Sequence, residues 1–307
     1  MRNTNSPAPK VMPPPRRPLL RIFPLALGLC LLATALRFWL APHLTRLPAD
    51  YAEEIRYAAR CRYRDTPDGT WQQFDLVVRR VDQTLVFSAD DAIIQGDVHW
   101  TTETGKVTYE SAGVYGIDRR TRSNLSGYGN MQRGGQFLFP KHVQRTTYQL
   151  WDPFYTGPRT ATFVEETTLN GLPVYVFDCR AKNIDDTTGY SFLVNVPERH
   201  HAYSAGGGKM WIEPISGIMV DMEDVGKSYF GTPKTGKWVS DFYFWHARYT
   251  PETKAAQWQR AVTARRRILA LELWLPIALL LSGLLSLALG VSGAFTTSNR
   301  ASTGSKP

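Results

Sequence analysis

The sequence has few of the residues that usually carry catalysis or hold metals. Its 307 residues include three cysteines and six histidines. It contains no Walker loop and no G-x-S-x-G, H-E-x-x-H or C-x-x-C motif. We therefore expect no catalytic residue, no cofactor and no metal site, and a non-enzymatic protein.

Basic residues show no excess in the middle of the chain, although the whole chain has a formal charge of +9. Residues 48–250 contain 22 Lys and Arg against 25 Asp and Glu, a net charge of −3. The flanks hold the other basic residues and only two acids, Glu252 and Glu272. A nucleic-acid-binding domain would need basic residues on the domain itself. The basic flanks instead suit anionic lipid headgroups, so the expected partners are membrane lipids and envelope proteins, without nucleic acid.

Two long apolar runs lie near the ends of the chain. Residues 19–41 read LLRIFPLALGLCLLATALRFWLA, and residues 268–291 read ILALELWLPIALLLSGLLSLALGV. Each is about as long as a helix that spans a bilayer. The first run could also be a cleaved signal peptide, because basic residues precede it and it contains Ala33 and Ala35. The length of the run favours an uncleaved anchor.

The charges beside the two runs give opposite indications of orientation. Lys10, Arg16, Arg17 and Arg21 favour a cytoplasmic N-terminus, whereas the three arginines at 265–267 would then face outward. The first helix usually decides, and long domains cross the membrane largely regardless of charge. We expect a two-pass protein of the bacterial plasma membrane, with both termini cytoplasmic and the central domain extracytoplasmic.

The fold class that follows is α+β, with a large, mostly antiparallel β extracytoplasmic domain flanked by one transmembrane helix at each terminus. The segment before Pro251 ends in Thr250, a suitable N-cap, and the residues after it favour a helix that continues into the second anchor. The expected parts are a disordered, basic, Pro-rich cytoplasmic tail (1–18), a transmembrane helix (19–41), the β-rich domain (48–250), a linker helix continuing into a transmembrane helix (251–291), and a disordered tail (292–307).

Several segments of the domain have the composition of strands. Residues 74–81, 84–88, 107–117 and 237–250 are rich in β-branched and aromatic side chains. The dipeptide Asn170-Gly171 predicts a type I′ hairpin, and residues 210–224 predict a second hairpin. The run Gly206-Gly207-Gly208 lacks the spacing of a phosphate loop, so we interpret it as a flexible turn.

The strand after the Asn170-Gly171 turn is apolar on both faces. Alternate side chains share a face, so Val174 and Val176 lie opposite Tyr175 and Phe177. We expect this strand to be covered on both sides, by the core of the sheet and by a helix, a loop or bound lipid.

An ordered series of motifs resembles a known family. The series is Val114-Tyr115-Gly116-Ile117-Asp118-Arg119-Arg120-Thr121, Phe137-Leu138-Phe139-Pro140, Thr147-Tyr148-Gln149-Leu150-Trp151-Asp152, Asn170-Gly171-Leu172-Pro173-Val174-Tyr175-Val176-Phe177 and Trp211-Ile212-Glu213-Pro214. The chain is similar in these motifs, over nearly its whole length, to the PorA-type porin family of actinobacteria. The resemblance implies a link to channels for some members, and it implies no catalytic residues.

The leading functional hypothesis is an envelope protein that binds or transfers an apolar, lipid-like ligand, or scaffolds an envelope partner. The alternatives are a channel-associated protein and, with the least support, an ectoenzyme. Strands with charges on both faces disfavour a single-chain membrane barrel. The candidate ligand-binding residues are Tyr175, Phe177, Trp211, Phe242 and Phe244. An enclosed apolar cavity would favour the ligand hypothesis.

Two cysteines of the domain, Cys61 and Cys179, could form one disulfide. The sequence cannot show that they meet, and two buried free thiols are the other interpretation.

Overall fold

The computed structural model describes residues 19–130, 133–152 and 157–302. The expected N-terminal tail, residues 1–18, lies outside the described residues. The chain divides into two compact units. One is a helical unit formed by the chain up to Pro42 and from Ala270 onward, and the other is a β unit, His43–Leu269.

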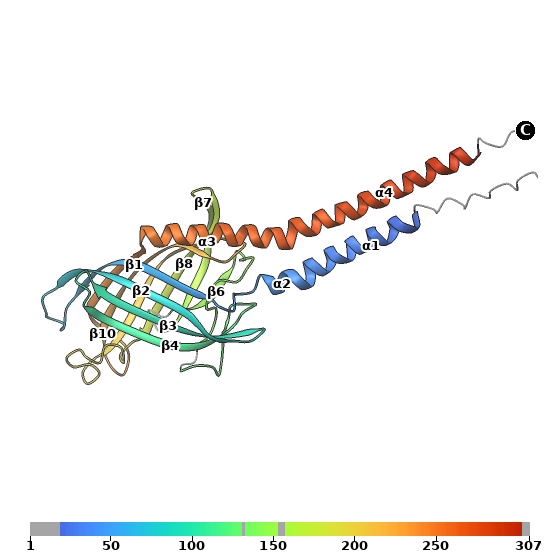
Figure 1. Ribbon diagram of the computed structural model, residues 1–307. Helices are drawn as coiled ribbons and strands as arrows, with labels where there is room; N and C mark the ends of the chain where they lie inside the picture. The colour runs from blue at the N-terminus through green and yellow to red at the C-terminus, as the bar shows by residue number, and fades with distance from the viewer. Residues whose placement is uncertain (1–18, 131–132, 153–156, 303–307) are drawn as a thin grey trace, which may run out of the picture. The chain divides into compact units, whose positions relative to one another are not determined.

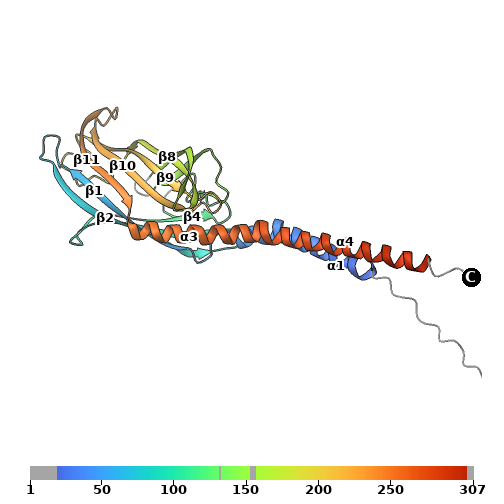
Figure 2. The same cartoon turned by 90° about the horizontal axis from the view of Figure 1, so that it is seen from above.

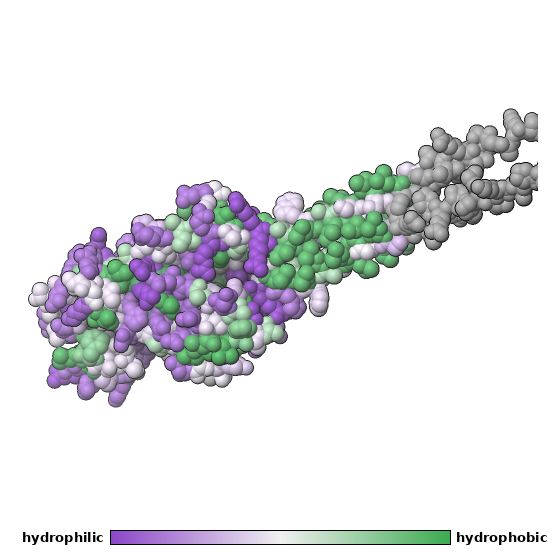
Figure 3. All heavy atoms as spheres, in the orientation of Figure 1, coloured by the Kyte–Doolittle hydropathy of each residue, from purple (hydrophilic) through white to green (hydrophobic). Residues whose placement is uncertain are grey.

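The helical unit contains α1 (Leu19–Ala35) and α4 (Leu275–Ser302), with short π-helical stretches η1 (Leu36–Leu40) and η2 (Ala270–Trp274). A Cβ on Gly283 would lie 3.2 Å from the carbonyl oxygen of Ala26, so the glycine lets α4 approach α1 closely. Most leucines of this unit are exposed, and its described surface is largely hydrophobic (Figure 3). Such a surface is typical of helices that face lipid.

In the part of the chain that the structure describes, two helical segments are long and apolar enough to cross a membrane. They are Phe23–Leu44, with mean hydropathy 1.8, and Pro251–Leu289, with mean hydropathy 2.2. The first includes the single turn α2 (Ala41–Leu44). The second includes α3 (Pro251–Leu269), which belongs to the β unit. Helix α4 extends to Ser302, beyond the expected end of the anchor at Val291.

The β unit is built on one antiparallel sheet of eleven strands in the order β5-β4-β3-β2-β1-β11-β10-β9-β8-β7-β6 (Figure 1). The sheet is strongly curled (Figure 2). Every pairing between strands is antiparallel, which confirms the predicted fold class. The strands are β1 (Ala52–Tyr63), β2 (Gln72–Phe87), β3 (Asp91–Thr102), β4 (Val107–Asp118), β5 (Asn124–Leu125), β6 (Thr147–Asp152), β7 (Gly157–Leu169), β8 (Leu172–Asp185), β9 (His201–Ile212), β10 (Met219–Gly231) and β11 (Trp238–Tyr249).

The segment around Gln136 links the two edges of this sheet. Gln136 forms an antiparallel bridge to Ser123, next to β5, and a parallel bridge to Leu150 of β6. Its carbonyl oxygen accepts a hydrogen bond of 3.0 Å from the backbone of Trp151. The curled sheet is therefore joined edge to edge at this point.

The turn chemistry read from the sequence is confirmed. Asn170 and Gly171 have φ values of 49° and 80°, as a type I′ turn requires, and Leu169 pairs with Leu172 across it. The second predicted hairpin joins β9 to β10 through a turn in which Gly217 has φ of 71°. The prediction of a flexible turn at Gly206–Gly208 is wrong, because these residues lie within β9. A Cβ on Gly208 would meet the carbonyl oxygen of Glu223 at 1.8 Å, so close backbone contact explains the glycine.

Helix α3 lies across one end of the strands. Thr250 caps it, accepting a hydrogen bond of 3.3 Å from the backbone N–H of Thr253. The Trp258 indole N–H donates to the carbonyl of Leu169 in the β7–β8 hairpin at 3.3 Å. Lys254 forms an ion pair of 2.7 Å with Asp221 of β10. The helix is thus fixed to several strands at the same end of the sheet.

Strand β8 is covered on both faces, as its sequence predicts. Val174 is fully buried in a cluster with Ala261 of α3. Phe177 is fully buried in the main core, and its ring centroid lies 4.9 Å from that of Phe139. Protein therefore covers both faces, a helix on one side and the core of the sheet on the other.

Candidate ligand-binding site

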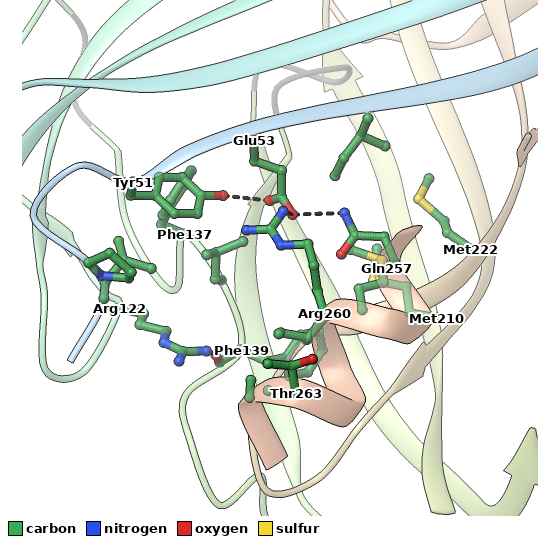
Figure 4. A pocket seen from close by; sticks show the side chains of 18 of the residues that line it. Tyr51, Glu53, Arg122, Phe137, Phe139, Met210, Met222, Gln257, Arg260 and Thr263 are labelled. Carbon is green, nitrogen blue, oxygen red and sulfur yellow. Dashed lines mark hydrogen bonds and ion pairs between the residues drawn. The ribbon is translucent and has the colours of Figure 1, made fainter. Parts of the chain in front are cut away.

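A cavity of about 490 Å³ lies between α3, strands β1, β9 and β10, and the segment around residues 137–139 (Figure 4). Alternation along β1 directs Ile55 and Tyr57 into it, and Met210 and Met222 enter from β9 and β10. These side chains are almost fully buried. The cavity therefore has a largely apolar floor on the inner side of the curled sheet.

Glu53 connects β1 to α3 at the wall of this cavity. Its carboxylate accepts hydrogen bonds from the Tyr51 hydroxyl at 2.5 Å, the Gln257 amide at 2.8 Å and the Arg260 guanidinium at 2.5 Å. Figure 4 shows the Gln257 and Arg260 side chains reaching from the helix to the carboxylate. The Glu53 side chain is only 8% exposed. Charge-assisted hydrogen bonds in such a site are stronger than neutral ones.

Five arginines line the same cavity: Arg46, Arg80, Arg122, Arg260 and Arg267. Three of them form ion pairs, Arg46 with Asp90, Arg80 with Asp82, and Arg260 with Glu53. The other two have no ion pair among the described residues and donate only to backbone carbonyls. Five arginines and three paired carboxylates therefore give this part of the cavity a net positive charge.

Arg122 is the most unusual of the five. It is 8% exposed, and its Nη1 donates to the carbonyls of Phe139 at 3.0 Å and Ser216 at 2.6 Å. Burial lowers the pKa of its guanidinium to about 10. Its φ of 63° places it in the left-handed region, where a residue other than glycine is uncommon.

A second cavity, of about 340 Å³, shares Tyr57 and Met222 with the first. Its walls are largely aromatic, with Trp100, Tyr190 and Tyr243 among them. The two cavities therefore lie in series along the inner face of the sheet.

Polar groups also reach the second cavity. The Ser204 hydroxyl donates to Asp186 at 3.1 Å. Burial, with a smaller contribution from neighbouring Asp185, raises the pKa of the Asp186 carboxyl to about 6. Within the described part of the chain, no group of three or more His, Cys, Asp or Glu side chains is placed to hold a metal. The two cavities therefore offer shape, apolar surface and a few hydrogen-bonding groups.

The structure does not bring the five candidate ligand residues together, and none of them lines either cavity. Tyr175 and Phe177 pack in the main core around Phe163, and Trp211 lies on the opposite face beside α3. Phe242 is fully buried against Phe230 and Tyr190, with ring centroids 4.5 and 4.9 Å away. Phe244 packs against Trp71 with the two rings tilted at 42° and their centroids 5.3 Å apart.

The two domain cysteines, Cys61 and Cys179, are buried, and the structure shows no disulfide between them. Cys61 lies on β1 and Cys179 on β8, and three strands separate them in the order of the sheet. Strands are spaced about 4.8 Å apart, so four spacings exceed the reach of a disulfide along the sheet. Cys61 accepts a hydrogen bond of 3.1 Å from the Tyr243 hydroxyl, and burial raises its pKa to about 11.

One signal in the sequence could have located some of the cavity residues. Residues 52–63 alternate Ile55, Tyr57, Ala59 and Cys61 on one face, which is the pattern of a half-buried strand. Arg122 follows directly after the motif at residues 114–121, but nothing in the sequence indicates that it is buried.

Comparison with solved structures gives only weak similarity. A protein described as exported, with a YmcC-like fold, from Bacteroides fragilis is 12% identical, with 65% of this chain and 96% of that chain covered and a TM-score of 0.29. A DUF1329 family protein from Desulfovibrio piger is 9% identical, with coverages of 77% and 92% and a TM-score of 0.20. A LolA superfamily protein from Nitrosomonas europaea is 9% identical, with coverages of 71% and 91% and a TM-score of 0.15. These scores are too low to support a functional argument.

A match to one family model covers most of the chain. No curated protein matches the chain significantly. The family model described as Porin PorA matches residues 22–292, which include most of the first apolar run, the whole second run and the whole β unit. The predicted resemblance is confirmed, and the chain belongs to the PorA porin family.

Proposed function

We propose that this protein binds an apolar, lipid-like ligand in the cavities on the inner face of its curled sheet. The observation that supports this function is the cavity of about 490 Å³, whose floor is largely apolar and whose wall carries arginine side chains. Pockets for small ligands are typically concave, about 300–1,000 Å³ in volume and mostly apolar. The second cavity, which shares Tyr57 and Met222, extends the space available to a long chain.

The proposal includes a membrane location. The two apolar helical segments anchor the protein in a bacterial plasma membrane, with both termini cytoplasmic and the β unit on the outer side. Reporter fusions at Gly129 and Ser298 test the orientation. An extracytoplasmic signal from Gly129 and a cytoplasmic signal from Ser298 are expected, and the reverse pattern would refute the orientation.

Lipid co-purification tests the ligand. The full chain is purified in detergent from its membrane, and extracted lipids are identified by mass spectrometry. Met222→Trp places a large side chain where the two cavities meet. Val225→Trp is the matched control, because Val225 lies on the same strand, is 48% exposed and lines neither cavity.

A lipid that is present with the wild type and Val225→Trp but absent with Met222→Trp would support the proposal, provided that all three have similar melting temperatures. Equal lipid content in the three proteins would place the lipid outside the cavities. No specific lipid in any of them, together with no binding of added fatty acid, would refute ligand binding.

The family description favours a channel-associated protein as the second candidate. Conductance of a planar bilayer containing the purified full chain tests it. A conductance that Met222→Trp leaves unchanged would support a channel independent of the cavities.

A further inference from the structure

The first cavity has more positive than negative charge. Of its five lining arginines, Arg122 and Arg267 form no ion pair with a carboxylate among the described residues, although Glu53 acts on Arg122 from a longer distance. A buried charge is costly unless it is paired and hydrogen-bonded. For Arg122, two backbone carbonyls satisfy some of the five N–H groups but do not neutralise the charge.

The backbone at Arg122 points to a function for this charge. A residue held in the left-handed region costs free energy and persists only where the surrounding structure enforces it, often at ligand sites. Here the carbonyl oxygen of Arg122 accepts a hydrogen bond of 2.9 Å from the backbone N–H of Phe137, which fixes the turn. The guanidinium is thereby held at the wall of the cavity rather than in solvent (Figure 4).

Some residues that line the cavity belong to the candidate membrane spans, which indicates that its ligand comes from the membrane. Leu44, at the end of the first candidate membrane span, lines the cavity, and so does Ile268, within the second. Arg267 also lines it and donates to the carbonyl of Leu44 at 3.2 Å. A ligand that leaves a membrane and enters at these residues would meet arginine side chains and an apolar floor together.

We propose that the ligand is an anionic amphiphile, whose carboxylate or phosphate binds Arg122 and Arg267 while its acyl chain lies over Ile55, Tyr57 and Met222. This inference rests on the proposed function and adds the chemical class of the headgroup. A guanidinium fork matches the geometry of a carboxylate or phosphate and can bind it through two hydrogen bonds. The apolar floor requires the attached chain, so a free anion is a poor ligand.

The test compares ligands that differ only at the headgroup. The full chain in detergent is titrated with a fluorescent fatty acid and with the fatty alcohol of the same chain. Inorganic phosphate, phosphatidylglycerol and phosphatidylcholine serve as competitors. The variants are Arg122→Met, Arg122→Lys and Arg267→Met, and Arg120→Met is the control, because Arg120 is exposed, two residues away and outside the cavity.

The fatty acid should bind at least about tenfold more tightly than the alcohol, because a hydrogen bond to a charged group contributes at least that factor to the affinity. Arg122→Met should remove most of that difference and leave the alcohol unaffected, with Arg122→Lys intermediate and Arg120→Met unchanged. Phosphatidylglycerol should compete better than phosphatidylcholine. Arg267→Met gives the same comparison at an exposed position if Arg122→Met fails to fold.

Three outcomes would overturn the inference. Equal affinity of the wild type for the fatty acid and the fatty alcohol would refute recognition of a charged headgroup, while apolar ligand binding would still stand. Competition by inorganic phosphate as strong as that by phosphatidylglycerol would identify a free-anion site. Binding of neither fluorescent probe would refute the proposed function itself.

Discussion

Glu53→Gln should loosen α3 without unfolding the sheet. The carboxylate uses two oxygens to accept from Tyr51, Gln257 and Arg260. A glutamine has one acceptor oxygen, and its NH₂ group would face donors, so at least one hydrogen bond is lost and the others lose their charge assistance. Losing such a bond in a site that is only 8% exposed costs about 1.5–3 kcal/mol.

Amide hydrogen exchange in α3 measures the effect. Local opening of the helix should become about tenfold to a hundredfold more frequent, while exchange in β3 and β4 should change little. The control is Glu54→Gln, because Glu54 pairs with Arg56 and Arg79 at the surface and its side chain is 37% exposed. Exposed pairs of this kind contribute up to about 1 kcal/mol. Equal exchange in α3 for the two variants would refute the assignment of Glu53 as the link between strand and helix.

Further variants test other parts of the β unit. Tyr115→Phe removes a buried hydrogen bond to Asp82 and should cost about 1.5–3 kcal/mol, seen as a lower melting temperature, whereas Tyr128→Phe at an exposed position should have no effect. Gly171→Val should cost about 1–2 kcal/mol because of positive φ, and Gly171→Asn should cost less. Burial raises the folded pKa of Asp186 from 3.8 to about 6, so ionisation destabilises the fold as the pH rises between these values. Asp186→Asn should therefore stabilise by up to about 3 kcal/mol at pH 7 and have no effect below about pH 3, and a pH-independent difference would contradict this. Cys61 and Cys179 should both react with a thiol label after denaturation without reductant, and failure of both to react would indicate a bridge.

Local signals in the sequence predicted local structure well. The positive φ at Asn170 and Gly171 follows from the two residues themselves, and so does the cap at Thr250 before Pro251. The strand character of residues 107–117 and 237–250 also depends on nearest neighbours, and these segments form β4 and β11. Such features are independent of how the sheet closes.

The cavities depend on contacts between residues far apart in the sequence. Tyr57 and Met222 lie on strands that are two positions apart in the sheet and meet only because the sheet curls. The sequence shows that aromatic residues are concentrated in the late strands, but it does not show which way each side chain points, and Phe242 lies in a core cluster. The alternation that separates Val174 from Phe177 was predicted correctly, but it could not indicate that α3 covers one side.

The three arginines at residues 265–267 illustrate how tertiary contacts change the meaning of a charge pattern. Counted as free charges, they oppose an outward position for the end of α3. In the structure Arg265 forms an ion pair of 2.6 Å with Glu213, a fully buried carboxylate that also accepts hydrogen bonds from the backbone N–H groups of Ile215 and Ser216. That pair neutralises one of the three charges once the β unit has folded, and it fixes α3 to the turn between β9 and β10. The positive charge of residues 265–267 therefore falls from three to two in the folded β unit, and the remaining arginines, Arg266 and Arg267, are both exposed.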